Sequence, residues 1–366
     1  MNLRIPGPTP LPDEVFAAMQ HAMIDHRGSE FAAVGKRVSA GLKTICQTRG
    51  DVLLFTCSGT GGLESAVVNS LSPGDRVLAF VAGWFGDRLA AVASAYGAQV
   101  EQVVFPQGAR IEPDAVRQAL RAQPAVKAVL VTHNETSTGV LHPLQAIAQA
   151  VRAHSEATLI VDAVSSFLAT PIPMDDWGID VLVSGSQKAL MCPPGVAVVA
   201  VGPRAWAAHQ RATMPRFYFD WTENKKWADL GQTAYTPAES VYFAMDAALT
   251  LIQKEGLDNF YARHARVADL TRELASEIGY ELLPRIEDSS PTVTALKVPD
   301  GLDGDEVRRI AREDFGVVFG GGQGNLKGKI IRVGHLGWVH EPEIESAMGA
   351  LKRATQRAQS MAAQAR

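Results

Sequence analysis

The chain has 366 residues, of which 46% are hydrophobic and 20% are charged, and its formal net charge is −4. This length favours two domains over one, while the small negative charge and the lack of Lys/Arg runs argue against a nucleic-acid-binding protein. The three cysteines, Cys46, Cys57 and Cys192, show no metal-ligand spacing and form an odd set, which indicates a reducing compartment. No signal peptide or membrane span is recognisable, so we expect a soluble cytoplasmic protein that needs no metal.

The first 20 residues are rich in proline and are expected to form an extended segment that lies across another part of the molecule. Helical patterns follow over residues 13–24 and 31–49. Six apolar runs typical of buried strands come next, at 52–56, 76–81, 126–133, 158–164, 180–185 and 196–201. Most of them are separated by helical patterns, at 62–71, 86–96, 113–122 and 143–154. This alternation predicts an α/β domain with a mostly parallel sheet covered on both faces.

The pattern changes after about residue 204. An aromatic, irregular segment at 216–226 is interpreted as an ordered loop, and a long helical pattern runs from 239 to 278 with a break near Gly256. Strand patterns at 292–298 and 329–337, with helical patterns near 304–314 and over 341–360, predict a smaller α+β domain. We expect the tail over residues 358–366 to fray. The predicted organisation is an N-terminal segment (1–20), a large domain (21–238) and a small C-terminal domain (239–366).

Two of the apolar runs lead to charged residues that would meet at one edge of the sheet. One run ends at Asp162, and the other continues through Ser184-Gly185-Ser186-Gln187 to Lys188. Open α/β sheets bind ligands at the carboxyl ends of their strands. A desolvated lysine is a nucleophilic amine, and a nearby carboxylate can pair with a protonated ring nitrogen; pyridoxal phosphate requires both. Taken alone, however, a lysine after a strand is usually a solvated loop residue, and an aspartate at a strand end is usually part of a turn or a helix cap.

A glycine-rich turn, SGTGG at 58–62, follows the strand at 52–56 and opens a helix. Unshielded N–H groups at a helix N-terminus form an anion site, and the hydroxyl of Thr60 adds a donor. A dinucleotide fingerprint would need glycine where Glu64 stands, and a P-loop would need Gly-Lys-Ser/Thr. The turn fits the phosphate of a mononucleotide-sized cofactor, although a plain tight connection would look the same.

Further features could surround a ligand. The aromatic pair Trp84-Phe85 could stack on a flat ring or simply close the core. The polar run HNETSTG (133–139) follows a strand, which is unusual unless something polar is held there. Arg332 stands alone between apolar residues and could clamp a substrate carboxylate or form a structural salt bridge. The glycine cluster at 319–325 is interpreted as a flexible loop beside the substrate.

Together these motifs resemble the class V aminotransferases of the fold type I pyridoxal-phosphate superfamily, especially the alanine–glyoxylate and serine–glyoxylate (serine–pyruvate) enzymes. The likeness spans nearly the whole chain: IPGPTP (5–10), HRGSEF (26–31), SGTGGLESA (58–66), FGDR (85–88), HNETSTGVL (133–141), VDAVSS (161–166), SGSQKAL (184–190), PRFYFDW (215–221), TAYTPAES (233–240) and GGQGNLKGKIIRVGHLG (321–337). It implies a seven-stranded, mostly parallel sheet in the large domain, pyridoxal 5′-phosphate as cofactor, and a homodimer with active sites at the interface.

The resemblance also implies a role for each matching residue around the cofactor. Lys188 would hold the cofactor as a Schiff base, and Asp162 would pair with its pyridine nitrogen. Val164 and Phe85 would enclose its ring. The residues implied for its phosphate are Thr60, Gly61, Gly62 and Gln187, completed by Thr236 or Tyr242 of the partner subunit.

On the substrate side, the resemblance implies that Arg332 binds the α-carboxylate and that Gly7 lines the pocket. Thr136 would bond the phenolic oxygen of the cofactor or lie near the substrate. The chain departs from the animal enzymes at Phe85, where they have tryptophan, and at Asn134, where glycine is common. Both changes bear on the choice of amino donor.

The implied reaction is ping-pong transfer of an amino group from alanine or serine to glyoxylate or another small oxo acid. Transaminases for 2-aminoethylphosphonate, ureidoglycine or phosphoserine are alternatives, because a few loop residues decide the substrate. An acidic second substrate group would need an additional arginine, for which Arg27 and Arg216 are candidates. A cysteine desulfurase is disfavoured because no cysteine follows Cys192, and a non-enzymatic α/β binding protein is the most distant alternative.

Overall fold

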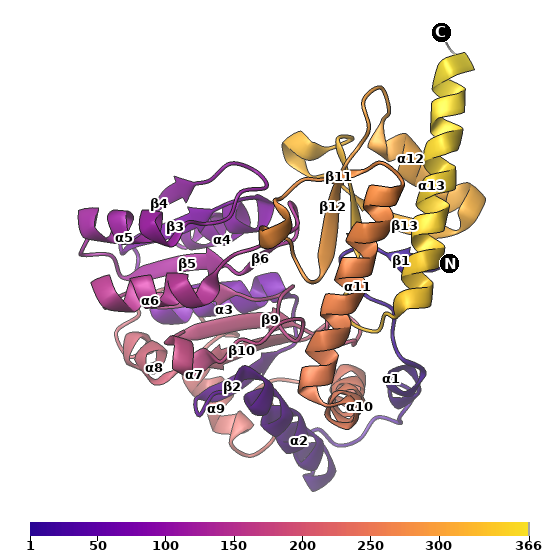
Figure 1. The fold of residues 1–366 in the computed structure, drawn as a ribbon. Coiled ribbons are helices and arrows are strands. Elements are labelled where there is room, and N and C mark those ends of the chain that lie inside the picture. Colours follow the sequence, from indigo (N-terminus) through magenta and orange to yellow (C-terminus); the bar gives the residue numbers. More distant parts are fainter. Residues whose placement is uncertain (365–366) are drawn as a thin grey trace.

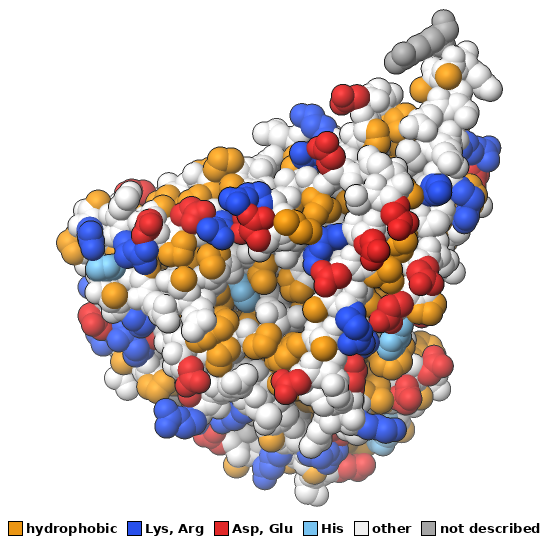
Figure 2. All heavy atoms as spheres, in the orientation of Figure 1, with side chains coloured by type: hydrophobic (Ala, Val, Ile, Leu, Met, Phe, Trp, Pro, Cys, Tyr) orange, Lys and Arg blue, Asp and Glu red, His pale blue; other side chains and the backbone are white. Residues whose placement is uncertain are grey.

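A computed structural model describes residues 1–364 and contains two large β-sheets, each packed against helices (Figure 1). Acidic and basic side chains are interspersed over the face drawn in Figure 2. Within the described chain, no helix combines the length and the apolar character needed to cross a membrane.

The larger sheet has seven strands in the order β2-β10-β9-β8-β5-β3-β4. The strands are β2 (Asp51–Phe55), β3 (Arg76–Val81), β4 (Gln99–Val104), β5 (Ala128–Thr132), β8 (Thr158–Asp162), β9 (Val181–Gly185) and β10 (Ala197–Val201). β10 runs antiparallel to β2 and β9, while the pairs β9–β8, β8–β5, β5–β3 and β3–β4 are parallel. The sheet is therefore mostly parallel, as predicted.

Helices cover both faces of this sheet, because successive residues of a strand point to opposite sides. In β3, Val77, Ala79 and Val81 belong to one apolar core, and Leu78 and Phe80 belong to the other. The first core takes in α3 (Gly59–Ser70), α4 (Trp84–Ala95), α8 (Pro203–His209) and α9 (Trp221–Ala228). The second takes in α2 (Ser29–Cys46), α5 (Pro113–Ala122), α6 (Leu144–His154) and α10 (Glu239–Glu255).

The smaller sheet has five strands in the order β1-β13-β14-β12-β11. They are β1 (Asn2–Arg4), β11 (Glu281–Leu282), β12 (Val293–Lys297), β13 (Val317–Gly321) and β14 (Ile330–Gly334), and they pack with α11 (Leu257–Glu277), α12 (Gly304–Phe315) and α13 (Glu341–Gln364). The predicted break between α10 and α11 falls at Gly256, whose φ of 85° favours glycine. The short elements are α1 (Asp13–Ala18), α7 (Met174–Trp177), β6 (Asn134–Glu135), β7 (Val140–Leu141) and the 3₁₀ turns Ile286–Asp288 and Gly324–Leu326.

The first residues of the chain connect the two sheets. β1 pairs in parallel with β13, with Asn2 opposite Val317. Farther along, the Thr9 N–H donates to the carbonyl of Gln187 (3.2 Å), and Thr9 Oγ1 donates to the carbonyl of Lys188 (3.2 Å). The N-terminal segment thus runs from the smaller sheet to the rim of the larger one.

Several sequence predictions need correction. The patterns miss β4, whose residues are all exposed or half-buried. The glycine cluster at 319–325 is not a flexible loop, because its first three residues belong to β13. The helix predicted over 13–24 ends at Ala18, and the tail predicted to fray stays helical to Gln364; residues 365–366 lie outside the described residues. The domain boundaries after residues 20 and 238 stay predictions.

Candidate active site

A cavity of about 180 Å³ lies where β8 ends and where the segments that follow β5 and β9 begin. It brings together seven of the residues that the sequence predicts for the site. These are Thr60, Phe85, Thr136, Asp162, Val164, Gln187 and Lys188. The remaining lining residues are Ser58, Gly59, Leu63, Arg88, Asn134 and Ser165.

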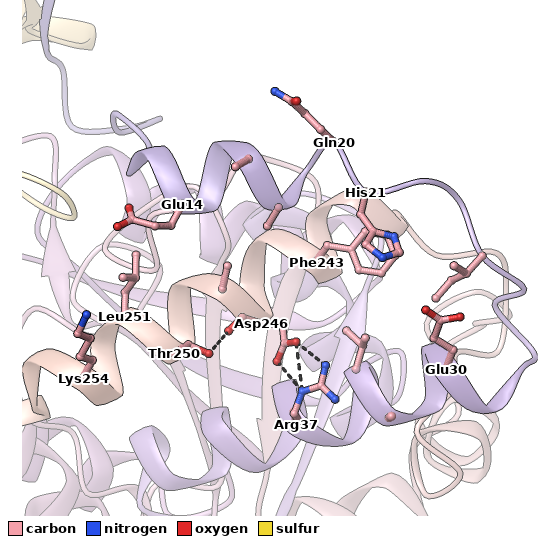
Figure 3. A pocket seen from close by; sticks show the side chains of 16 residues that line it. Glu14, Gln20, His21, Glu30, Arg37, Phe243, Asp246, Thr250, Leu251 and Lys254 are labelled. Atoms are coloured by element: carbon pink, nitrogen blue, oxygen red, sulfur yellow. Dashed lines mark hydrogen bonds and ion pairs between the residues drawn. The ribbon is translucent and has the colours of Figure 1, made fainter.

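A larger cavity of about 820 Å³ lies between α1, α2 and α10 (Figure 3). Phe243, Leu251 and the ion pair of Arg37 with Asp246 (2.6 Å) are part of its wall. None of the predicted site residues lines it. The chemistry that the sequence predicts is therefore gathered at the smaller cavity.

Lys188 follows β9, and its Nζ donates a hydrogen bond to the carbonyl of Pro6. The pKa of Lys188 falls from 10.5 to about 8, mainly because burial disfavours the protonated form and because Arg332 and Arg88 are positively charged; Asp162 opposes this shift. At pH 7 about one amine in ten is then neutral, which is far more than for an exposed lysine. Lys188 is thus prepared to act as a nucleophile and as a base.

Asp162 is the last residue of β8 and is buried. Its Oδ1 accepts a hydrogen bond from the Val164 N–H (2.9 Å). Burial raises the pKa of Asp162 to about 6, and the charge of Glu135 acts in the same direction, against the charges of Lys188 and Arg88. A buried carboxyl group of this kind gains most from a cationic partner, and a protonated pyridine nitrogen is such a partner.

The N-terminus of α3 faces the cavity with glycines packed tightly beneath it. Ser58 occupies the N-cap position with no side-chain capping hydrogen bond, so N–H groups of the first turn are open to an anion. A Cβ on Gly59 would lie 2.8 Å from Val164 Cγ2, and one on Gly62 would lie 2.8 Å from Val183 Cγ1. The turn therefore needs glycine for its close approach to the sheet. Gly61 and Gly62 lie on the same turn as Thr60 without lining the cavity.

The polar run after β5 forms a hydrogen-bonded wall of the cavity. Asn134 Nδ2 donates to Ser165 Oγ (2.8 Å) and Thr292 Oγ1 (3.0 Å), and Thr136 Oγ1 donates to Ser165 Oγ (2.7 Å). Asn134 Oδ1 is buried and has no hydrogen-bond partner among the described residues. Ser165, which the sequence analysis did not single out, links the two predicted residues.

Glu135 is a buried residue that sequence reasoning missed as a functional side chain. Its carboxylate accepts hydrogen bonds from the N–H groups of Phe85 (3.1 Å), Gly86 (3.1 Å) and Ser137 (3.1 Å) and from Ser137 Oγ (2.5 Å). It thereby caps α4 and holds the backbone of Phe85. Burial raises the pKa of Glu135, and these donors oppose the shift. The only signal was an acid within a polar run after a strand.

Arg332 and Gly7 lie next to the cavity lining rather than on it. Arg332, on β14, is 8% exposed and donates from Nε to the carbonyl of Gly321 (2.7 Å) and from Nη1 to that of Thr136 (3.0 Å). Gly7 has a φ of 107°, and a Cβ there would lie 2.7 Å from Lys188 Nζ. Gly7 therefore packs against the amine, and Arg332 reaches the polar wall of the cavity from the smaller sheet.

The structure does not bring Thr236 and Tyr242 to the cavity. Thr236 is exposed on the segment before α10, and its role at a partner's phosphate stays a prediction. Tyr242 is 3% exposed, and its ring packs on Phe31 with 5.2 Å between centroids. Its role at a partner's phosphate likewise stays a prediction.

The two arginines considered for an acidic substrate group are engaged elsewhere. Arg27 stacks on the ring of Trp227 (4.0 Å to its centroid) and donates to the carbonyls of the neighbouring loop. Arg216 pairs with Asp220 (3.1 Å) and donates to three backbone carbonyls. The arginine that lines the cavity is Arg88.

The side chains present fit pyridoxal phosphate. The first turn of α3 offers unshielded N–H groups for a phosphate. Lys188 supplies an amine with a lowered pKa, and Asp162 supplies a buried carboxyl group for the ring nitrogen. The partnerless Asn134 Oδ1 leaves an acceptor free on the same wall. Among residues 1–364, no group of three or more His, Cys, Asp or Glu side chains is placed to hold a metal ion.

Comparison with known proteins agrees with this geometry. The family model of class V aminotransferases matches residues 2–326. The chain is 42% identical to a protein named soluble hydrogenase, small subunit, from Synechococcus sp., over 96% of this chain and 91% of that protein. It is 38% identical to an L-aspartate–glyoxylate aminotransferase from Paracoccus denitrificans, over 91% and 85%. It superposes on the crystal structure of an alanine–glyoxylate aminotransferase from Nostoc sp. with a TM-score of 0.93 and 32% identity, over 96% of this chain and 94% of that one.

The architecture is that of the pyridoxal-phosphate-dependent transferases of fold type I, so the predicted fold class and cofactor are confirmed. The chain belongs to the class V aminotransferases. This result confirms the predicted transaminase and rules out the non-enzymatic binding protein.

Proposed function

We propose that the enzyme transfers an amino group from a small amino acid, alanine or serine, to glyoxylate or another small oxo acid. The observation that carries the proposal is the gathering of Lys188 and Asp162, with their shifted pKa values, at one cavity of about 180 Å³. Because the cofactor would fill part of this cavity, the space that is left favours small substrates. The name of the Nostoc neighbour supports alanine as donor and glyoxylate as acceptor.

The roles of the residues follow from their chemistry. When bound, pyridoxal phosphate supplies an electron sink that stabilises a carbanion at the substrate's Cα. Lys188 would hold the cofactor through its neutral amine and, when released, would accept the proton from the substrate's Cα and deliver it to the cofactor side of the imine. Asp162 stays ionised and keeps a proton on the ring nitrogen. Phe85 and Val164, both lining the cavity, enclose the ring.

The substrate side is formed by Arg332 and the polar wall. Arg332 uses Nε and Nη1 on backbone carbonyls, which leaves its Nη2 group as the donor for an α-carboxylate. The polar wall of Asn134 and Thr136 then holds the substrate's remaining polar atoms. In this arrangement the α-carboxylate is held beside Lys188, where proton transfer at Cα takes place.

The test is a half-reaction screen with purified protein loaded with pyridoxal phosphate. Single amino acids are added, and absorbance near ~420 nm, where a lysine-bound cofactor absorbs, is followed. We expect alanine or serine to bleach the band and glyoxylate to restore it, whereas Lys188→Ala forms no such band. A band that forms but responds to neither donor would contradict the substrate assignment and favour an aminoethylphosphonate, ureidoglycine or phosphoserine transaminase.

We also propose that the enzyme is a homodimer of the cytoplasm with active sites at the interface. The groove between α1, α2 and α10 and the exposed Phe16 (56%) and Phe217 (80%) offer apolar surface for a partner copy. The three cysteines are free, which suits a reducing compartment. Sedimentation of the active enzyme should give twice the mass of the chain, and a fully active monomer would contradict the dimer.

A further inference from the structure

Arg88 is a charged residue of the cavity to which the reaction proposed above gives no task. It lies one turn after Phe85 on α4 and lines the cavity together with Lys188 and Asp162. Its guanidinium carbon is 4.9 Å from the centre of the Phe85 ring, a cation–π contact that orients the side chain. Its charge lowers the pKa of both Lys188 and Asp162. Arg88 therefore acts within the site and not on the outer surface of α4.

Arg88 forms no ion pair within the described part of the chain, although its charge acts on the carboxylate of Asp162. Among residues 1–364, no carboxylate lies at ion-pair distance from it, and its contact is with the Phe85 ring. Other arginines with little exposed side chain do form ion pairs: Arg216 pairs with Asp220 at 3.1 Å, and Arg263 pairs with Glu255 at 2.8 Å. A half-buried guanidinium without an anion leaves a fork of donors open to a ligand.

The other anionic groups expected at the cavity already have binding partners. The N-terminus of α3 suits the cofactor phosphate, and Arg332 suits the α-carboxylate of the substrate. Arg27 and Arg216 are held by Trp227 and Asp220 and do not line the cavity. Arg88 is thus the cation left for a further acidic group.

We propose that Arg88 binds the second carboxylate of a dicarboxylic substrate, so that the enzyme accepts aspartate-class donors or oxo acids in addition to small neutral ones. This inference rests on the proposed transaminase function and names a further substrate class for the same cavity. The planar fork of an arginine matches a carboxylate bidentately. The L-aspartate specificity that the Paracoccus relative carries in its name is consistent with such a site.

The experiment compares the wild type with Arg88→Gln, which keeps a polar side chain without charge, and Arg88→Lys, which keeps charge without the fork. Arg121→Gln, on the exposed face of α5, controls for the loss of one positive charge. Each holoenzyme is titrated with succinate and with propionate, which cannot react, and single-turnover rates are measured with aspartate and alanine. The affinity of each apoprotein for pyridoxal phosphate is measured separately by fluorescence.

We expect Arg88→Gln to lose about 10- to 100-fold in succinate affinity and in kcat/KM for aspartate, because one charge-assisted bidentate pair is removed. Propionate binding and cofactor affinity should change less than about 3-fold, and Arg88→Lys should lie between. Because the charge of Arg88 also acts on Lys188 and Asp162, selectivity is judged from the ratio of kcat/KM for aspartate to kcat/KM for alanine, which should fall in Arg88→Gln. Equal losses for both donors, or a wild type that does not prefer succinate to propionate, would overturn the proposal. Weaker cofactor binding with unchanged selectivity would also overturn it and place Arg88 on the phosphate.

The titrations separate this proposal from the broader function. If no donor reacts but succinate still binds through Arg88, the transaminase substrates are wrong while the anion site stands. If alanine and glyoxylate react normally but succinate binding ignores Arg88, the proposed function stands and the second-carboxylate site fails.

Discussion

Replacing Lys188 by methionine should make the cofactor-free protein more stable at neutral pH. The folded protein holds Lys188 with a pKa lowered from 10.5 to about 8, which corresponds to a penalty of about 3 kcal/mol below pH 8. Methionine removes the charge at similar volume but also removes the hydrogen bond to Pro6, worth about 1 kcal/mol. The expected net gain for Lys188→Met is therefore about 2 kcal/mol at pH 7.

The gain should depend on pH in a defined direction. Below pH 8 the lysine is protonated in both states, and the full penalty is present. Between about 8 and 10.5 the unfolded chain binds more protons than the folded one, so the wild type gains stability as the pH rises. By pH 10 the advantage of Lys188→Met should have disappeared.

The assay is urea unfolding of the apoproteins at pH 7 and pH 10, at equal protein concentration because the protein is proposed to dimerise. Lys352→Met, at an exposed position of α13, controls for the loss of a lysine as such and should show no pH-dependent difference. If wild type and Lys188→Met have the same midpoint at both pH values, Lys188 is not desolvated, and the argument for a nucleophilic amine loses its basis.

Three further predictions concern the groups around Lys188. Asp162→Asn should slow the half-reaction with alanine by at least ~100-fold, because the ring nitrogen loses its anionic partner; stopped-flow absorbance measures this, and a rate within tenfold of wild type would contradict the role. Glu135→Ala should destabilise the protein by about 3–5 kcal/mol, because buried N–H groups at the start of α4 lose their hydrogen-bond acceptor. Urea denaturation measures this against the exposed-site control Glu345→Ala, and a loss of stability below about 1 kcal/mol would contradict the prediction. Gly7→Ala should slow cofactor attachment, because its Cβ would lie 2.7 Å from Lys188 Nζ. Gly74→Ala is the control, because Gly74 also has a positive φ (86°) but a Cβ there meets nothing within 4 Å; equal rates of reconstitution with pyridoxal phosphate in the two variants would refute the steric argument.

The elements that the sequence predicts well are those with strong local patterns. The buried strands ending at Asp162 and near Lys188 are uninterrupted apolar runs, so their type and their common edge follow from the residues alone. The edge strand β4 has no buried residue and therefore no apolar run to reveal it. β13 contains glycines that suggest a loop, but its pairing with β1 and β14 overrides that preference.

The parts of the site that escape the sequence are those set by distant packing. No local sequence pattern indicates that Glu135 accepts hydrogen bonds from the N–H groups of α4, because this contact depends on how α4 packs against the sheet. Choosing among Arg27, Arg216 and Arg88 likewise requires knowing which arginines are already paired. The burial of Tyr242 follows from the packing of α10 on α2, which its sequence neighbourhood does not show.

The connection between β1 and β13 has a consequence for biosynthesis. The segment that gives Lys188 its hydrogen-bond acceptor leaves the ribosome long before its strand partner at Val317–Gly321. The surroundings of the lysine can therefore be completed only after β13 has been translated, and contacts of such sequence separation form slowly. A bulky fusion ahead of Asn2 would slow the pairing of β1 with β13, whereas a fusion placed after α13 would leave this pairing unaffected.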